Sequence, residues 1–528
     1  MVILNILLFI VVLGVIILIH EAGHFYFAKK AGILCHEFSI GMGPALYQKR
    51  KGETIYSIRG IPIGGYVSMA GESVSDALIN KDQTIGINVN EQGQVHQIIL
   101  TDQVSADVYG TVEAFDLYGK DFDPLYIELK VDDVIKRYPV LRDATYQLDQ
   151  KRKMWITPSE KSFESKTLWQ RFLVIFAGPM MNFILAFLLF LIVGFFVEQP
   201  NVDSNEIQDI TPNYAADIAG LESGDRLLAI NGEPIESWTD LSMVMSNLDQ
   251  VVVDITYDRD GEVFISYDNN ISVAVQMAGI TNTYTNLETN EITIYQSEPI
   301  IGQSFGRAQT DGKLQSGDRI VAIVIDNTSF EVENWDDIIQ IFKQYDRGSI
   351  VVTYSRDGEL ANANYDLISE SALNKLGSSG ILFQLGVTAT SGFNWGYTLL
   401  YAPKRFYQNV MEVFTTIGLL FNRSENLGIG DLSGPIGIYS LVSSTASQGL
   451  LSIIAFTGFL SINIGLLNLL PIPALDGGRL VFLGLEAITR KPLPRKVENT
   501  IINIVFILLL VMFVYVTYND ILRLIAGS

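Results

Sequence analysis

The chain has 528 residues, of which 48% are hydrophobic, and a formal net charge of −22. Because a single soluble core rarely grows beyond roughly 250–300 residues, this length excludes one globular domain. A single cysteine excludes an internal disulfide and a zinc site of several thiolates, and the acidic balance argues against nucleic acid as a partner.

Four near-continuous apolar runs predict membrane-spanning helices, because each approaches the ~20 residues needed to cross hydrocarbon. They are Val2–Ile19, Phe172–Val197, Leu450–Leu475 and Ile501–Tyr515. The first run has no basic start and no small-residue cleavage site, so we expect it to be a retained helix, not a signal peptide. The predicted fold class is a multi-pass α-helical membrane protein with four transmembrane helices, in segments 1–30, 169–198, 449–486 and 498–526.

Basic residues near the span ends predict the orientation in the bilayer. One group follows the first run and a second lies between the third and fourth runs: Lys29, Lys30, Lys49, Arg50 and Lys51, then Arg479, Arg490, Lys491, Arg495 and Lys496. The positive-inside rule places both groups in the cytoplasm. Four spans then put both termini outside the cytoplasm, together with the segment Glu198–Asn394, which has 31 acidic and 9 basic residues.

Segments 31–74 and 75–168 follow the first helix and are both expected to be rich in β-structure. In the first, short β-type runs such as Ile61–Val67 are broken by Gly and Pro, which predicts hairpins close to the membrane. The second is polar, with strand-like stretches at Val95–Leu100 and Leu125–Val131. We expect it to be a cytoplasmic β-rich insertion.

An internal repeat occupies the acidic segment. Leu221–Ile230 matches Leu314–Ile323 at an offset of 93 residues, and Trp238–Leu241 matches Trp335–Ile338 at an offset of 97. A Gly-Asp-Arg turn that leads into an apolar strand and then a helix resembles PDZ domains. The resemblance implies tandem extracytoplasmic PDZ-like α+β domains at 199–295 and 296–392, with ligands on the extracytoplasmic side.

The segment Trp395–Phe421, within 393–448, mixes aromatic and basic residues at helical spacing. Such a helix lies on a membrane surface, or it packs against the neighbouring modules. The sequence leaves both alternatives open.

The sequence His20-Glu21-Ala22-Gly23-His24 at the end of the first apolar run is the central motif. On an α-helix the two histidines lie about 40° apart around the axis, so both imidazoles reach one metal ion. Glu21 projects about 100° from His20, where it reaches a water on the metal, as a general base must. Chance occurrence is the alternative, but ionisable residues at the end of a membrane span are costly and usually functional.

A catalytic zinc needs a third protein ligand and an open position for water. Asp476 is the candidate, because it follows a run interrupted by Pro471 and Pro473, and irregular backbone at membrane depth indicates a buried site or a watery cavity. His36 and His96 lie on polar or loop-like segments and are predicted to be surface residues.

These motifs together resemble the site-2 protease family of intramembrane zinc metalloproteases, and within it the bacterial regulator-of-sigma-factor protease branch in its Gram-positive form. The resemblance rests on His20–His24, Phe176–Asn182, the PDZ-like repeat and Asn468–Gly478. It implies that His20, His24 and Asp476 bind Zn²⁺ and that Glu21 is the catalytic base.

The resemblance also assigns groups that hold the substrate. Asn468, Pro471 and Pro473 are similar to the family segment that holds the substrate strand, and Asn468 is expected to stabilise the oxyanion. The stretch Ile61–Val67 is similar to the family's membrane-reentrant β-hairpin, whose edge pairs with an unwound substrate helix. The substrate-binding residues expected there are Ile61, Ile63, Gly64 and Gly65.

The predicted function is therefore intramembrane cleavage of single-span membrane proteins, with anti-sigma factors and remnant signal peptides as the substrates that the resemblance implies. A non-catalytic membrane scaffold with a structural metal site is the alternative, but a structural zinc needs no base such as Glu21. An anchored protease acting on soluble proteins outside the cell is disfavoured, because the motif is predicted to face the cytoplasm.

Overall fold

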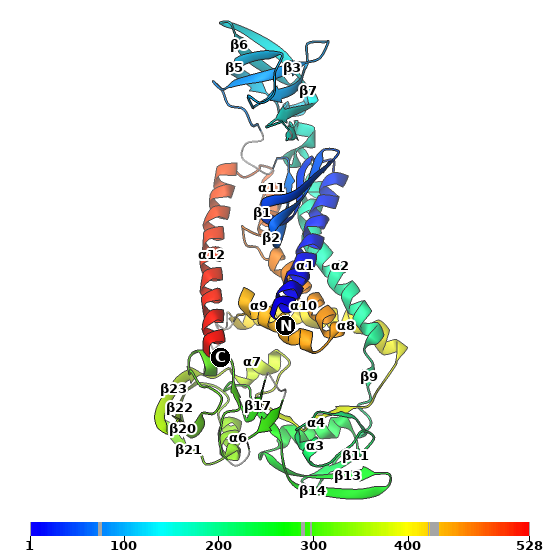
Figure 1. The fold of residues 1–528 in the computed structure, drawn as a ribbon, viewed down its shortest axis with the longest axis vertical. Helices are drawn as coiled ribbons and strands as arrows, with labels where there is room; N and C mark the ends of the chain where they lie inside the picture. The colour runs from blue at the N-terminus through cyan, green and yellow to red at the C-terminus, as the bar shows by residue number, and fades with distance from the viewer. Residues whose placement is uncertain are drawn as a thin grey trace. The chain divides into compact units, whose positions relative to one another are not determined.

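The computed structural model describes residues 2–71, 77–150, 152–286, 291–295, 298–420, 422 and 432–526. The chain forms two compact units (Figure 1). The first comprises residues 1–189 and 442–509, and the second comprises residues 190–441 and 510–528.

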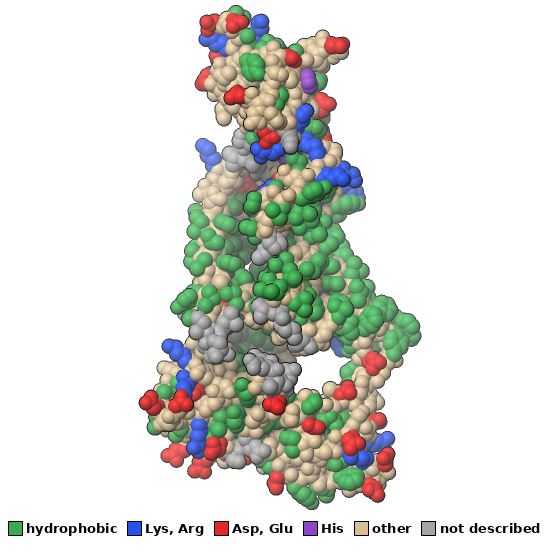
Figure 2. All heavy atoms as spheres, in the orientation of Figure 1, with side chains coloured by type: hydrophobic (Ala, Val, Ile, Leu, Met, Phe, Trp, Pro, Cys, Tyr) green, Lys and Arg blue, Asp and Glu red, His purple; other side chains and the backbone are tan. Residues whose placement is uncertain are grey.

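Among the described residues, four helices are long and apolar enough to cross a membrane, which confirms the number of predicted spans. They are α1 (Val2–Lys30), α2 (Leu168–Phe196), α10 (Leu450–Leu469) and α12 (Arg495–Ala526). Exposed apolar side chains line α1, α2 and α12 (Figure 2). The third helix ends at Leu469, ahead of the predicted Leu475, because Pro471 lacks a backbone donor and disfavours helical geometry in the residue before it.

The segment after α1 forms one sheet from two long, bent strands, β1 (Cys35–Lys51) and β2 (Thr54–Met69). Residues 55–58 of β2 pair with both halves of β1, whereas residues 61–69 pair only with residues 35–42. The bend in β1 uses Gly41 and Gly43, whose φ angles of 81° and 83° favour glycine. Residues 61–69 are therefore one edge of the sheet, and residues 45–51 are the other.

The insertion after this sheet is a small barrel with its own core. Its sheet has the order β4-β3-β5-β6-β7-β8, and a parallel pairing of β4 with β7 closes the ring. Buried Ile87, Ile98, Ile127 and Tyr146 fill the interior. The strands are β3 (Thr84–Val89), β4 (Val95–Ile99), β5 (Val108–Asp116), β6 (Tyr126–Val131), β7 (Val134–Gln147) and β8 (Lys153–Trp155).

In the second unit, the repeat in the sequence is a repeat in the structure. Two sheets have equivalent strand orders, β12-β11-β13-β14 and β21-β20-β22-β23. Ser237 and Asn334, each directly before a repeated Trp, cap the equivalent helices α4 and α6. The first copy contains α3 (Ala215–Ile218), β11 (Arg226–Ile230), β12 (Glu233–Pro234), α4 (Trp238–Asn247), β13 (Val252–Arg259) and β14 (Glu262–Asn270). The second contains α5 (Gly306–Thr310), β20 (Arg319–Ile325), β21 (Thr328–Glu331), α6 (Trp335–Gln344), β22 (Ser349–Arg356) and β23 (Glu359–Asp366).

Shorter strands complete this unit. A third four-stranded sheet has the order β19-β16-β15-β24, so β24 is at its edge. The other elements of this unit are β9 (Gln199–Pro200), β10 (Ile207–Ile210), β15 (Ser272–Val275), β16 (Ile280–Thr281), β17 (Thr283–Thr285), β18 (Ile292–Ile294), β19 (Gln303–Ser304), α7 (Glu370–Lys375), β24 (Ile381–Gln384), β25 (Val387–Ala389) and β26 (Ser391–Gly392). The division between the two units falls within α9 (Pro435–Ser447).

The segment predicted to lie on a membrane surface or under the modules is a helix, α8 (Trp395–Leu420). One set of its side chains is buried, including Ala402 and Val413, while the large apolar Leu399 and Phe414 are exposed. Phe421, the last residue of the predicted segment, lies outside the described residues.

The repeated Gly-Asp-Arg turn is held by a buried ion pair in each copy. Asp225 accepts hydrogen bonds from Nε and Nη2 of Arg259, at 2.9 and 2.7 Å. Asp318 accepts from the same two atoms of Arg356, both at 2.7 Å. These aspartates are 2% and 1% exposed, so each copy relies on its arginine to compensate a buried charge.

Asp318→Ala is expected to destabilise the second copy by about 2 kcal/mol, because it removes the charge-assisted hydrogen bonds to Arg356, which is itself partly exposed. Hydrogen exchange of β20 and β22 in the intact protein measures this loss. Asp366→Ala is the control, because that aspartate is exposed on the same sheet. Equal exchange in the two variants would contradict the role of the pair.

Candidate metal centre

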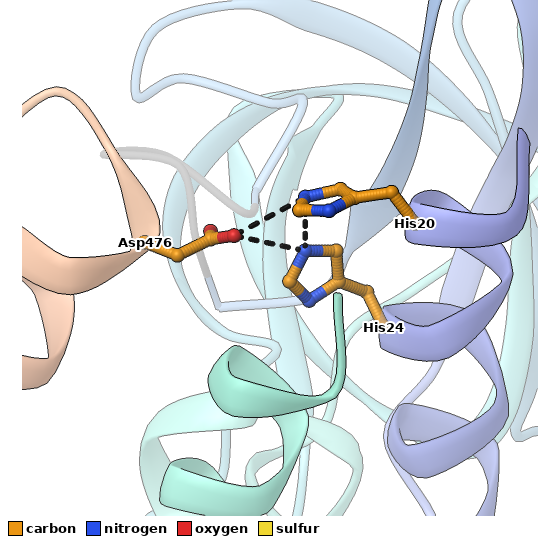
Figure 3. Close-up of side chains that lie close together, drawn as sticks. All are labelled: His20, His24 and Asp476. Atoms are coloured by element: carbon orange, nitrogen blue, oxygen red, sulfur yellow. Dashed lines mark hydrogen bonds and ion pairs between the residues drawn. The ribbon is translucent and has the colours of Figure 1, made fainter. Parts of the chain in front are cut away.

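His20 and His24 project from successive turns of α1 toward a common point (Figure 3). Their Nε2 atoms are 3.2 Å apart, and each residue is 8% exposed. The spacing of four residues places both rings on one side of the helix, as the sequence predicted.

Asp476 is the first residue of α11 (Asp476–Thr489) and points at the same position (Figure 3). Its Oδ2 atom lies 3.2 Å from Nε2 of His20 and 3.3 Å from Nε2 of His24. The structure thus brings together the three side chains proposed as ligands, although 452 residues separate His24 from Asp476.

The glycines after Asp476 are required by a close backbone approach. A Cβ atom on Gly477 would lie 2.2 Å from the carbonyl oxygen of Leu470, and one on Gly478 would lie 2.3 Å from that of Ile472. The segment between α10 and α11 therefore folds back onto the start of α11, and this contact fixes Asp476.

Gly478→Ala is expected to push α11 away from this segment and to move the Asp476 carboxylate out of reach of the histidines. Zinc bound per purified chain, measured by elemental analysis, should fall well below the wild-type value. Gly484→Ala is the control on the same helix, because a Cβ atom there meets nothing within 4 Å. Wild-type zinc content in Gly478→Ala would contradict this role.

The three atoms fit a tetrahedral zinc ion. Bonds of 2.0–2.1 Å at tetrahedral angles put ligand atoms about 3.3 Å apart, which matches the observed separations. Oδ2 of Asp476 is buried and makes no regular hydrogen bond to any described residue. A buried carboxylate oxygen that lacks a hydrogen bond is costly unless a cation lies beside it. Two imidazole nitrogens and one carboxylate oxygen are a donor set that zinc binds.

Helix α2 supplies no ligand but contacts both histidines. The carbonyl oxygen of Val174 lies 2.8 Å from Nδ1 of His24, and Nδ2 of Asn182 lies 3.3 Å from Nδ1 of His20. Between them, a Cβ atom on Gly178 would lie 2.2 Å from Nε2 of His24, so only glycine fits. The sequence analysis assigned no role to these residues. A polar Asn within an apolar span is nevertheless a sign of a functional role.

The site opens into a cavity of about 270 Å³. Glu21 and Asn468, the two predicted catalytic residues, both line it. Tyr66 also lines it and was not predicted. The complete lining is His20, Glu21, His24, Tyr66, Val67, Met69, Val174, Ile175, Asn468, Ala474, Leu475, Asp476 and Arg479.

Of the residues predicted to bind substrate, Asn468 lines this cavity, and the others belong to the sheet edge or to the segment between α10 and α11. A Cβ atom on Gly65 would lie 3.4 Å from Cγ of Glu21, so the edge of the β1–β2 sheet passes beside the predicted base. Gly64 has φ 91°, and Ile61 is 50% exposed on the same edge. The side chain of Ile63 lies outside the described residues. Pro471 and Pro473 do not line the cavity, but Ala474 and Leu475 directly after them do.

Glu37 anchors this edge of the sheet. It accepts hydrogen bonds from Ser57, from Nη2 of Arg59 at 2.7 Å and from the hydroxyl of Tyr66 at 2.7 Å. Burial raises the pKa of Glu37, but these bonds outweigh burial, so its pKa lies below the usual value. Burial and the bond to Glu37 raise the pKa of Tyr66 to about 12, so the tyrosine stays a neutral donor.

Arg479, His36 and His96 lie outside the proposed ligand set. Arg479 is exposed and lines the cavity, which places a cation beside the site. His96 is exposed as predicted, but the prediction for His36 was wrong. His36 is partly buried beside Thr157, and burial lowers its pKa to about 4. The packing of the insertion over β1 could not be read from the local sequence.

Known proteins resemble nearly the whole chain. The sequence model of peptidase family M50 matches residues 8–512. Zinc metalloprotease RasP of Shouchella clausii is 32% identical over 525 residues, which cover 98% of this chain and 99% of that protein. Zinc metalloprotease RasP of Geobacillus kaustophilus is 30% identical over 519 residues, 98% and 97% of the two chains. Regulator of sigma-W protease RasP of Bacillus subtilis is 30% identical over 524 residues, 98% and 99% of the two chains.

Proposed function

The chain belongs to peptidase family M50 and is a zinc metalloprotease, and from this premise we propose that it cuts single-span membrane proteins within the bilayer. The observation that carries the proposal is the meeting of His20, His24 and Asp476 at the end of an apolar spanning helix. With the family shown, the alternative of a non-catalytic scaffold is set aside.

We assign His20, His24 and Asp476 as the zinc ligands. A zinc ion held by these residues would lower the pKa of a bound water and polarise the substrate carbonyl. Glu21 takes the proton of the attacking water and returns it to the leaving amine, because it lines the cavity beside the two histidines. Asn468 lines the same cavity and is proposed to donate a hydrogen bond to the carbonyl oxygen as negative charge develops there.

The edge formed by residues 61–69 is proposed to hold the substrate as an added strand. A transmembrane helix hides its peptide bonds, so it must be unwound before hydrolysis, and an edge strand then satisfies the freed backbone groups. Three observations support this edge: residues 61–69 have no second strand partner among the described residues, Gly65 lies beside Glu21, and Tyr66 lines the cavity. The turn that contains Pro471 and Pro473 is proposed to contact the substrate at Ala474 and Leu475.

Cysteine cross-linking tests this arrangement. In the Glu21→Gln background, Ile61→Cys should form a disulfide with a cysteine placed in the apolar span of a single-span substrate. Tyr47→Cys is the control, because it is 57% exposed on the opposite edge of the sheet. The natural Cys35 is fully buried and does not compete. Equal cross-linking from both positions, or from Tyr47→Cys alone, would contradict the substrate strand.

The substrate class is proposed from the comparison with Bacillus subtilis. That relative is named a regulator of sigma-W protease, which supports membrane-anchored anti-sigma factors as substrates here. Remnant signal peptides are a second class with the same chemistry, because each is a single apolar span. We further propose that the active site lies near the cytoplasmic face of the cell membrane, with both termini and the repeat region outside, as the distribution of basic residues indicates.

The repeated modules are proposed to be PDZ-like and to select trimmed substrates, by holding a new carboxyl terminus or by excluding large outer domains. A cavity of about 570 Å³ supports the first route, because it lies between α4 and the edge strand β24. Trp238, Leu241 and Met245 line one side, and residues 381–387 line the other. An extended peptide would add to β24 as a further strand. The groove of the first copy is thus completed by chain that follows the second copy.

A further inference from the structure

The two metal-facing histidines must carry their ring protons on the far nitrogen. A neutral imidazole has one N–H, and only the nitrogen without it binds a metal ion. Nε2 of both rings faces Oδ2 of Asp476, so a bound zinc would use these atoms. The proton must then lie on Nδ1 of each ring, where it needs an acceptor.

For His24 the acceptor is evident. The carbonyl oxygen of Val174 is 2.8 Å from Nδ1, and a carbonyl only accepts, so Nδ1 carries the proton. This bond fixes the tautomer that leaves Nε2 free for zinc.

For His20 the only described polar side chain against Nδ1 is that of Asn182, at 3.3 Å. Asn182 is fully buried, and its Oδ1 atom has no hydrogen-bond partner among the described residues. In the orientation observed, Nδ2–H donates to Nδ1, and Nε2–H is left to face Asp476. A half-turn of the carboxamide exchanges its two ends and presents Oδ1 to Nδ1–H, which is the arrangement that zinc requires.

We propose that Asn182 is a positioning residue that places the ring proton of His20 on Nδ1, through its side-chain oxygen, and so prepares Nε2 for zinc. The inference rests on the assignment of His20 as a ligand. Asn182 is itself held in place, because its backbone carbonyl accepts a hydrogen bond from Ser461 of α10 at 2.8 Å. Together with Val174 and Gly178, it gives α2 one contact with the metal centre on each successive turn.

Zinc affinity of the purified full-length protein, measured by competition with a chelator, tests the proposal without relying on activity. Asn182→Leu keeps the number and branching of the side-chain heavy atoms but removes the acceptor, and it should weaken zinc binding about 10–100-fold. Asn182→Asp restores an acceptor oxygen and should bind zinc as tightly as the wild type.

Two results would overturn the proposal. The first is wild-type affinity in Asn182→Leu, and the second is an equal loss in the Leu and Asp variants, which would show a role in packing alone. His20→Ala is the reference for the metal site. If it lowers affinity while Asn182→Leu does not, the inference fails and the ligand assignment stands; if neither lowers affinity, both fail.

Discussion

Glu21→Gln is expected to lower cleavage of a single-span substrate about 10²–10⁴-fold while the protein keeps its zinc. Glutamine has nearly the same size as glutamate, so the cavity beside His20 and His24 stays intact. Its carboxamide does not take a proton from water, so the base is lost without loss of a ligand. Cleavage of a tagged substrate by the purified variant, with zinc content measured on the same sample, checks both parts.

Cleavage and zinc content of Glu21→Gln together separate a role as base from a role in metal binding. Loss of cleavage together with loss of zinc would show that Glu21 supports the metal centre and is not only a base. Undiminished cleavage would remove Glu21 from the mechanism. Glu498→Gln is a suitable control, because it makes the same chemical change on α12, outside the residues that line the metal-site cavity.

Asp476→Ala is expected to lower zinc affinity by more than about 100-fold, because loss of a ligand exceeds the 10–100-fold effect of an outer contact. Cleavage should fall to background with it. The reason is geometric: in the described structure, His20 and His24 meet a single carboxylate, and Oδ2 of that carboxylate is 3.2–3.3 Å from both nitrogens.

Thr489→Ala is the control for damage to α11, because Thr489 is exposed at the far end of the same helix. The zinc content of the two variants is measured in parallel. Equal zinc in Asp476→Ala and in the control would remove Asp476 from the ligand set. In that case the carboxylate would be a hydrogen-bond partner of the histidines only.

Local patterns in the sequence were sufficient to predict the spanning helices and the meeting of His20 and His24. Apolar runs and the spacing of four residues act within a single helix, so no knowledge of packing is needed. The spacing of the histidines does not identify Asp476, because this residue lies on another helix. The irregular Pro471–Pro473 segment directly before it indicated a buried site there. The repeat also extends to the ion pairs: Asp225 and Asp318 are 93 residues apart, and their partners Arg259 and Arg356 are 97 apart.

Other features depend on how distant elements pack. Nothing in the sequence near His20 shows that Asn182 or the carbonyl of Val174 will lie against it. The edge position of residues 61–69 follows from the bend at Gly41 and Gly43, which sends the two halves of β1 to different places in the sheet. The parallel pairing of β4 with β7 joins strands with two others between them in the chain, and no local pattern marks it.

We propose that this chain hydrolyses peptide bonds inside a membrane span by means of the centre at His20, His24 and Asp476. The most direct measurement is mass spectrometry of the products formed from a tagged single-span substrate, after the purified protein and the substrate are reconstituted together in liposomes. We predict a cut within the apolar span that is present with the wild type and absent with Glu21→Gln. A cut confined to the soluble flanks, or the same cut with Glu21→Gln, would contradict intramembrane cleavage by this centre.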